Sequence, residues 1–317
     1  MDLSSQMRAT MASQPAALRA LLADTAPVEA VARRLEGRRL FIVGTGTSWH
    51  AANHTMFLLR RAGVEAWAVQ AMDFELDPPL LREADGVIVL SHTGRTRYAR
   101  AALDGLRARG VETVLVSGYG VADADLLTGE QETSAAYTAS HLAALLRLAQ
   151  VAALLGADLG GLAEVPDVVA RVLARPIGPV APPARLLEFI GLGTNQWTAA
   201  EGALKVREAA HVAAQGLSVE QFLHGPAVAV GQADTLVCLD GGGPGSERLA
   251  VVANAALAAR VTVHRAVHTE LGEPLSVFAL TVEVQQVALG CAEALGTNPD
   301  SFGEDVPGRE GWHVLAD

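Results

Sequence analysis

Short apolar runs alternate along this chain with longer segments that have helical periodicity. The runs end at glycines or hydroxyl residues, which is typical of buried strands that lead into a turn. We predict strands near residues 40–44, 65–69, 86–90 and 113–117, and again near 187–191, 235–239 and 261–264. Strands that alternate with helices indicate parallel sheets covered on both faces.

One strand–turn–helix pattern occurs twice. Residues 40–52 read LFIVGTGTSWHAA and residues 187–199 read LEFIGLGTNQWTA, so a Gly-x-Gly-Thr turn follows an apolar run in both halves. We therefore predict an α/β fold with two doubly wound, Rossmann-like domains at residues 35–165 and 178–317, each a parallel sheet flanked by helices. A helical arm at residues 1–34 precedes the two domains.

Composition narrows the class of protein. Half of the 317 residues are hydrophobic and 19% are charged, which suits a packed core rather than a disordered chain. The net charge of -11 argues against nucleic acid as a partner. Cys238 and Cys291 lie in apolar runs and fit free thiols in a reducing compartment. We find no signal-peptide pattern and no apolar stretch that we judge long enough to cross a bilayer, so we expect a cytoplasmic protein with no membrane partner.

Two predicted turns carry groups that suit a phosphate. Residues 91–96 read SHTGRT between an apolar strand and a helix, and they offer hydroxyls, a glycine for close approach and a helix N-terminus. The turn after the first strand adds further hydroxyls. The predicted phosphosugar-binding residues are Gly46, Thr47, Ser48, Ser91, His92, Thr93, Gly94 and Thr96. These hydroxyls could merely cap helices, but two such loops favour anion binding.

The Gly-x-Gly turn could instead belong to a dinucleotide fingerprint. That fingerprint needs a third glycine at the helix start and an acidic residue at the end of the next strand, where this chain has Trp49 and Gln70. His50 and His54 stand four residues apart, but the glutamate of a zinc-binding H-E-x-x-H motif and a third ligand are missing. The sequence therefore predicts no metal and no dinucleotide cofactor.

The second half carries titratable residues at helical spacing. Glu201, Lys205 and Glu208 follow one another at intervals of four and three residues, so they share one face of a predicted helix. A surface ion-pair ladder would explain this row, but flanking alanines indicate a covered helix and hence a candidate acid/base array. His224 precedes a Gly-Pro break that would expose its imidazole for proton transfer, although a lone histidine is more often structural.

These segments resemble one known family. A strand ending in GTGTS and a later strand ending in S-x-[ST]-G-x-T resemble the phosphosugar-binding SIS (sugar isomerase) domain. EGALKVRE at residues 201–208 and EQFLHGP at 220–226 resemble the motifs EGALKLKE and ELKHGP of the isomerase half of glucosamine-6-phosphate synthase. Tandem-SIS deaminases and deglycases of amino-sugar phosphates share this pattern. The resemblance covers about residues 35–315.

The resemblance implies an enzyme that acts on a hexose 6-phosphate, by aldose–ketose isomerisation or by release of an amine. Glu208 would be the base that moves a proton between C1 and C2, and Glu201 and Lys205 would line the site. His224 would help to open the sugar ring, near the site of the neighbouring subunit in a homodimer. The alternative is a non-catalytic phosphosugar sensor, which would need neither Glu208 nor His224.

Several departures from the synthase leave isomerase, deaminase and deglycase open. We expect no glutaminase activity, because the amidotransferase domain and its cysteine nucleophile are missing from the sequence. Arg95 stands where the synthase has glutamate, Thr93 where it has serine, and the tail at residues 298–312 contains no lysine. The second half has LDGGGPGSE in place of the hydroxyl-rich loop, so we expect one phosphate site per chain, mostly from the first half.

Overall fold

The computed structural model describes residues 5–175, 180–303 and 307–308, and its chain divides into two compact units. Ala16–Glu132 and Ala139–Ala163 form the main part of one, here called the N-sheet unit. Thr133–Thr138 and most of the chain from Glu164 onward form the other, here called the C-sheet unit. Helix α1 (Gln6–Ala23) is shared, with the division at Pro15. The domain boundaries expected from the sequence stay predictions.

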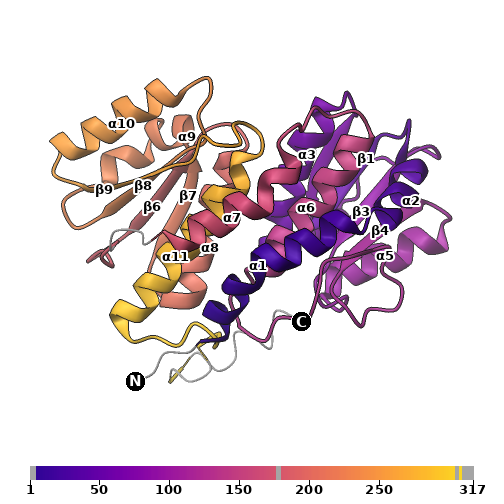
Figure 1. Ribbon diagram of the computed structural model, residues 1–317, viewed down its shortest axis with the longest axis horizontal. Helices are drawn as coiled ribbons and strands as arrows, with labels where there is room; N and C mark the ends of the chain where they lie inside the picture. Colours follow the sequence, from indigo (N-terminus) through magenta and orange to yellow (C-terminus); the bar gives the residue numbers. More distant parts are fainter. Residues whose placement is uncertain (1–4, 176–179, 304–306, 309–317) are drawn as a thin grey trace. The chain divides into compact units, whose positions relative to one another are not determined.

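The N-sheet unit, drawn in indigo to magenta in Figure 1, is built on a parallel sheet. The strand order of this sheet is β2-β1-β3-β4-β5. The strands are β1 (Leu40–Gly44), β2 (Ala66–Gln70), β3 (Gly86–Leu90), β4 (Glu112–Ser117) and β5 (Leu126–Leu127). Its helices besides α1 are α2 (Ala26–Leu35), α3 (Thr47–Arg61), α4 (Ala71–Leu76), α5 (Arg97–Ala108) and α6 (Ala139–Leu154). All residues of β1 and β3 are buried, as a sheet covered on both faces requires.

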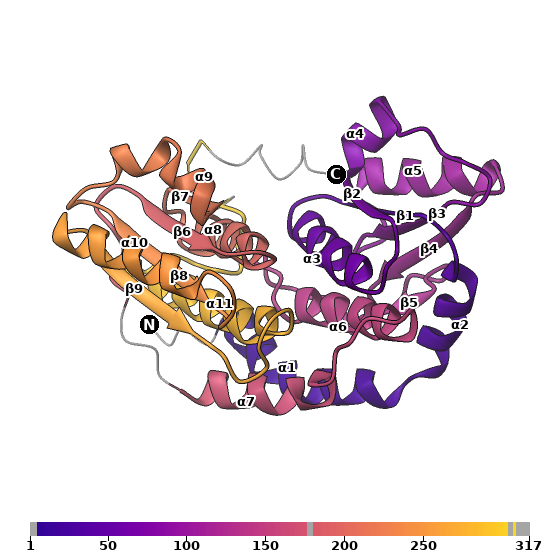
Figure 2. The same cartoon turned by 90° about the horizontal axis from the view of Figure 1, so that it is seen from above.

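Helices cover both faces of this sheet. Phe41, Val43 and Val89 belong to one core cluster with apolar residues of α4 and α5. Helix α3 packs against β1, β2 and α6, and Figure 2 shows α3 and α6 on the side of the sheet opposite to α4 and α5. The carboxyl ends of the strands therefore remain the edge at which the loops gather.

The C-sheet unit repeats this plan with the strand order β7-β6-β8-β9, again all parallel. The strands are β6 (Leu187–Gly191), β7 (Ala214–Ser218), β8 (Thr235–Asp240) and β9 (Thr262–Val267). The helices are α7 (Val165–Ala174), α8 (Asn195–Ala210), α9 (Val219–Leu223), α10 (Ser246–Ala258) and α11 (Ser276–Leu295), with a 3-10 turn at Pro226–Ala229. A further 3-10 turn, Leu162–Glu164, spans the point in the chain where the two units divide. Apolar residues of α8 and α11 form one core cluster, and those of α9 and α10 form another. The prediction of an α/β fold with two parallel sheets is confirmed.

Strands β1 and β6 both end in a glycine that the following helix requires. A Cβ atom on Gly44 would lie 2.5 Å from the carbonyl oxygen of Ser48, and one on Gly191 would lie 2.2 Å from that of Asn195. Each helix therefore starts directly against the strand that precedes it, which explains the recurring Gly-x-Gly turn.

Helix α11 was not recognised as a long apolar segment in the sequence. By length and composition it could cross a membrane, but 78% of its most apolar window is buried inside the protein. Core helices of soluble proteins pass the same test, so this helix is weak evidence for a membrane segment. In the C-sheet unit it packs against α7, α8 and β9.

Candidate functional site

The two hydroxyl-bearing loops of the N-sheet unit follow neighbouring strands. Strand β1 pairs directly with β3, with Val43 opposite Val89, so both strands end at the same edge of the sheet. Helix α3 begins at Thr47, directly after Gly46, and Ser48 is the next residue. Thr47 and Ser48 thus lie at the start of the helix that follows β1, and residues 91–96 follow the neighbouring strand β3, so the two segments lie at the same edge of the sheet.

Residues 91–96 form a compact turn. Ser91 is buried and its hydroxyl lies 3.2 Å from the hydroxyl oxygen of Thr96, while Gly94, at φ 67°, donates its N–H to the Ser91 carbonyl at 3.0 Å. The N–H of Arg95 donates to the Thr93 hydroxyl at 3.2 Å. The loop thereby gathers three hydroxyls and the start of α5 at one point, which suits a phosphate.

Helix capping does not account for these residues. Thr96 occupies the cap position of α5, yet its side chain makes no capping hydrogen bond. At α3 the cap position is held by Gly46, which has no side chain and adopts a φ of 57°. Because a capping role would need a side-chain acceptor at these positions, the structure weakens the alternative of simple N-caps.

His92 differs from its neighbours in the loop, because its ring turns into the protein. The N–H of Glu132 donates to Nε2 of His92 at 3.2 Å, and a Cβ on Gly118 would lie 2.8 Å from the ring carbon Cε1. Burial lowers the pKa of the imidazole, which the nearby carboxylate of Glu132 offsets in part. His92 therefore supports the loop from inside the protein, through the hydrogen bond from Glu132.

The underside of the loop is held by residues that sequence reasoning missed. Ser117 donates its hydroxyl to the carbonyl of Ser91 at 2.6 Å, and the amide of Gln131 donates to the carbonyl of His92 at 3.0 Å. Glu132 also accepts a hydrogen bond from the N–H of Ser140 at 2.7 Å, near the start of α6. No local pattern in the sequence distinguishes these residues, because their role depends on contacts between distant loops.

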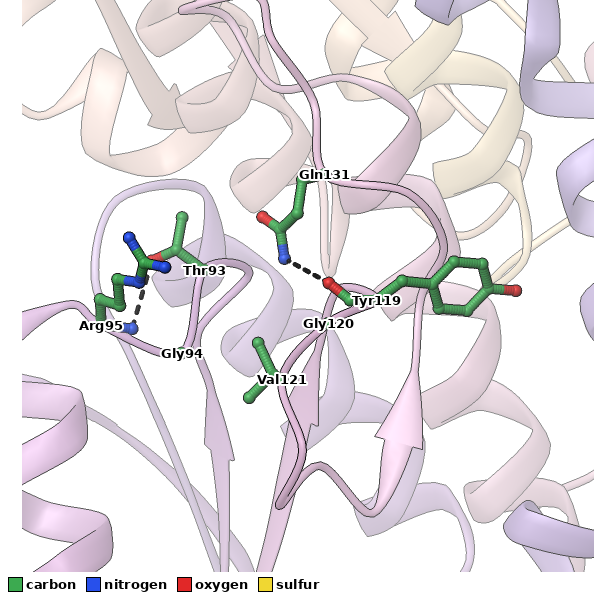
Figure 3. Close-up of a pocket in the computed structure, with 7 residues that line it drawn as sticks. All are labelled: Thr93, Gly94, Arg95, Tyr119, Gly120, Val121 and Gln131. Carbon is green, nitrogen blue, oxygen red and sulfur yellow. Dashed lines mark hydrogen bonds between the residues drawn. The ribbon is translucent and has the colours of Figure 1, made fainter.

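A pocket of about 500 Å³ opens beside the loop of residues 91–96. Thr93, Gly94 and Arg95 line it on one side and the segment after β4 lines the other, with Gln131 between them (Figure 3). The lining residues are Thr93, Gly94, Arg95, Tyr119, Gly120, Val121 and Gln131. Arg95 is the one charged side chain in this lining, so the pocket favours an anionic ligand.

The row predicted on α8 is formed and is covered. Glu201 and Lys205 are 0% and 1% exposed, and the Glu208 side chain is 18% exposed. The Lys205 ammonium lies 2.5 Å from Oε2 of Glu208 and 3.5 Å from Oε1 of Glu201. The row is therefore not an exposed ion-pair ladder, because Glu201 and Lys205 are almost fully buried. Burial of charged groups costs free energy, and such groups are often found at functional sites.

His224 stands apart as an exposed group. It ends α9, just before Gly225 at φ 150°, and its side chain is 78% exposed. Its Nε2 atom lies 3.6 Å from a carboxylate oxygen of Glu220. The structure thus brings Glu201, Lys205 and Glu208 together and places His224 on a surface loop, as the Gly-Pro break predicts.

The described part of the chain contains no group of three or more His, Cys, Asp or Glu side chains placed to hold a metal ion. His50 and His54, the pair considered for zinc, both lie on α3. Two histidines also lie next to a carboxylate in the C-sheet unit, but as hydrogen-bond partners. The oxygens of Glu283 lie 2.6 Å from Nε2 of His264 and 2.5 Å from Nε2 of His268.

Comparison with known families identifies the class of the first half. Residues 35–153 match the model of the SIS domain, so this stretch of the chain is a SIS domain. The match covers the sheet of the N-sheet unit with both hydroxyl-bearing loops. The expectation of a second SIS domain, in tandem with the first, stays a prediction.

The relatives lie among aminotransferases of sugar phosphates. The glutamine–fructose-6-phosphate aminotransferase (isomerizing) of Pyrococcus horikoshii is 32% identical over 210 residues, which cover 59% of this chain and 35% of that protein. This chain thus aligns with about a third of the length of that relative. The homology to part of these enzymes agrees with the resemblance found in the motifs.

Solved structures share the fold across nearly the whole chain. A glucosamine-6-phosphate deaminase from Thermotoga maritima matches with a TM-score of 0.77 at 20% identity, covering 93% of this chain and 97% of that one. A tagatose-6-phosphate ketose/aldose isomerase from Escherichia coli matches with a TM-score of 0.76 at 19% identity, covering 95% of each chain. At this level of identity the likeness establishes the fold.

Proposed function

We propose that this protein is an enzyme that binds a hexose 6-phosphate and either interconverts its aldose and ketose forms or releases an amine from it. The observation that carries the proposal is the buried row on α8, where Lys205 lies 2.5 Å from Glu208 and 3.5 Å from Glu201. Acid/base chemistry needs ionisable groups held next to one another, and here a partly exposed carboxylate, Glu208, lies beside the buried Lys205 and Glu201.

The phosphate anchor would be the loop of residues 91–96 with Thr47 and Ser48. Ser91, Thr93 and Thr96 supply hydroxyls at the start of α5, and the adjoining pocket of about 500 Å³ is within the usual range for small-molecule sites. A bound phosphate would provide binding energy remote from the reacting carbons and so fix their orientation. His92 acts in this proposal by holding the loop rather than by touching the ligand.

Glu208 would be the group that moves the proton. Its side chain is 18% exposed and so keeps access to a ligand, whereas Glu201 and Lys205 are almost fully covered. One carboxylate can take the proton from one carbon and return it to the next across an enediol-like intermediate. Lys205 would neutralise charge beside it, and Glu201 would hold the Lys205 ammonium in place.

The relatives support the substrate class. The names of these relatives and structurally similar proteins refer to fructose 6-phosphate, glucosamine 6-phosphate and tagatose 6-phosphate. All three compounds are hexose 6-phosphates or their amino derivatives. We propose that this chain acts on the same class of compound in the cytoplasm, and that its reaction needs neither a glutaminase nor a cofactor.

We also propose that His224 opens the sugar ring at the site of a neighbouring subunit in a homodimer. Its 78% exposed side chain is available to a partner. Mixing Glu208→Gln with His224→Asn protein tests this. If the two residues act from different subunits, one of the two sites in each mixed dimer is intact. About half of the dimers in a randomly reassorted 1:1 mixture are mixed, so the mixture should regain about a quarter of the wild-type activity. No recovery on mixing would refute the shared site.

The experiment for the proposed activity offers the purified protein glucosamine 6-phosphate, fructose 6-phosphate and fructosyl-amine phosphates. Ammonia, amine release and ketose formation are followed in parallel for wild type, Glu208→Gln and Glu247→Gln, an exposed control on α10. Turnover that survives in the control and disappears in Glu208→Gln supports the enzyme. Sugar phosphates that raise the melting temperature without any turnover would favour the sensor instead.

A further inference from the structure

The carboxyl edge of the C-sheet unit has the same arrangement as the phosphate-binding edge of the N-sheet unit. Strand β6 pairs with β8, with Gly191 opposite Leu239, just as β1 pairs with β3. Loops 192–194 and 241–245 therefore correspond to the two hydroxyl-bearing loops of the first half. The second of these loops contains glycines and a proline in place of serines and threonines.

A carboxylate of the chain itself lies at this edge. Oε1 of Glu273 accepts a hydrogen bond from Nδ2 of Asn195 at 2.6 Å and another from the hydroxyl of Ser276 at 3.3 Å. Asn195 is the first residue of α8 and Ser276 is the first residue of α11, and both are 0% exposed. The N-termini of two long helices thus converge on one negative charge, which their dipoles favour.

The glycine-rich loop closes tightly around this carboxylate. A Cβ on Gly241 would lie 2.2 Å from Oγ of Ser276 and 2.9 Å from Nδ2 of Asn195, and a Cβ on Gly243 would lie 3.3 Å from Cγ of Glu273. A side chain at position 241 would collide with the groups that bind the carboxylate, and one at position 243 would make a tight contact with the Glu273 side chain itself. The composition of LDGGGPGSE therefore follows from what the loop surrounds.

The segment that delivers Glu273 is firmly anchored. At its start, the N–H of His268 donates to the carbonyl of Asp240 at 2.9 Å, and the His268 ring bonds the Glu283 carboxylate at 2.5 Å. At its end, the N–H of Ser276 donates to the carbonyl of Gly272 at 2.7 Å. The carboxylate is thus held in place from both sides by the fold of the C-sheet unit.

We propose that Glu273 is a resident anion at the start of α8, the helix that corresponds to α3 with Thr47 and Ser48 in the N-sheet unit. At the loop that corresponds to residues 91–96, the carboxylate of Asp240 accepts hydrogen bonds from the N–H of Gly242 and the hydroxyl of Ser246. This inference rests on the proposed phosphate site at residues 91–96. It explains why the chain binds one phosphosugar although its plan is repeated: the second edge keeps its anion-binding groups but satisfies them internally. In this proposal the C-sheet unit contributes Glu201, Lys205 and Glu208 and binds no phosphate of its own.

Removal of the resident anion should create a phosphate site. Binding of inorganic phosphate and of fructose 6-phosphate is measured by titration calorimetry on wild type, Glu273→Ala and Glu270→Ala, a control carboxylate in the same segment. The same measurements are made in a Ser91→Ala/Thr96→Val background, which removes the first site. We expect one phosphate per chain for wild type and the control, two for Glu273→Ala, and one for Glu273→Ala in the altered background.

The outcomes separate this inference from the proposed function. Folded Glu273→Ala protein that binds no more phosphate than wild type overturns the resident anion. Wild type that binds no phosphate refutes the loop at residues 91–96, while phosphate bound by Glu273→Ala alone would still support the second site. If Glu273→Ala is unfolded in phosphate-free buffer, phosphate should restore its folding and melting transition, and failure to do so also overturns the inference.

Discussion

We predict that the buried carboxyl group of Glu188 makes the free energy of unfolding of the protein fall as the pH rises. Glu188 lies on β6, is 1% exposed, and its Oε1 atom has no hydrogen-bond partner among the described residues. Burial, together with the nearby carboxylate of Asp234, raises the pKa of Glu188 from 4.5 to about 7. The folded protein therefore holds a proton here that the unfolded chain has already released.

The sign and size follow from this difference. Below pH 4.5 Glu188 is protonated in both the folded and the unfolded state, so its ionisation does not affect the free energy of unfolding. Between pH 4.5 and about 7 Glu188 is protonated in the folded state only, so the free energy of unfolding falls as the pH rises. The slope is about 1.4 kcal/mol per pH unit. Over the whole window the loss amounts to roughly 3 kcal/mol, since each unit of pKa corresponds to about 1.4 kcal/mol.

Glu188→Gln should remove this dependence. Above pH 7 the variant should be more stable than wild type by roughly 3 kcal/mol, whereas below pH 4.5 the two should be nearly equal. Urea unfolding followed by circular dichroism across the window measures both values, with the exposed Glu130→Gln as control. A variant that is less stable than wild type above pH 7 would mean that the carboxylate is charged and partnered, contrary to this reasoning.

Further substitutions test the fold and the site. Arg147→Ala should cost about 2–5 kcal/mol, because a side chain only 2% exposed and bonded to Leu21 and Asp24 is lost; urea unfolding with a loss below about 1 kcal/mol would contradict this. Gly191→Ala should lower the free energy of unfolding by about 3 kcal/mol, because its methyl group would overpack against Asn195. Gly105→Ala should raise the free energy of unfolding by about 0.5–1 kcal/mol, because the space around this position on α5 is open. Equal urea midpoints for the two variants would contradict this difference between the glycines. Lys205→Met should lower kcat about 100-fold or more, while phosphosugars should still raise the melting temperature of the variant. An unchanged kcat would contradict a role of Lys205 in the reaction.

The sheets and their ligand edge could be predicted from the sequence because they depend on local patterns. Apolar runs that lead into turn residues, either glycines or the hydroxyl residues after β3, place β1, β3, β6 and β8 close to the observed positions. Strand β7 was missed because its sequence AQGLS is partly exposed and has no apolar run. Helix α11 was missed for the opposite reason, since a helix apolar on nearly every side has no periodic pattern.

Some contacts of the candidate site could also be predicted from the sequence, and others could not. The row of Glu201, Lys205 and Glu208 follows from helical spacing, so the sequence predicts it and the structure confirms that these side chains meet. The inward turn of His92 and the carboxylate of Glu273 at the second edge depend on contacts between distant segments. Such contacts leave no pattern along the chain, and only the folded structure reveals them.

The most direct test of the central claim is proton exchange at the sugar. The protein is incubated with fructose 6-phosphate or glucosamine 6-phosphate in heavy water, and the protons on C1 and C2 are followed by NMR. We predict that wild type and Glu247→Gln replace a C1 or C2 proton with deuterium and that Glu208→Gln does not. Exchange that persists at the wild-type rate in Glu208→Gln would contradict the assignment of the base, and the absence of exchange in wild type with both compounds would contradict the proposed enzyme.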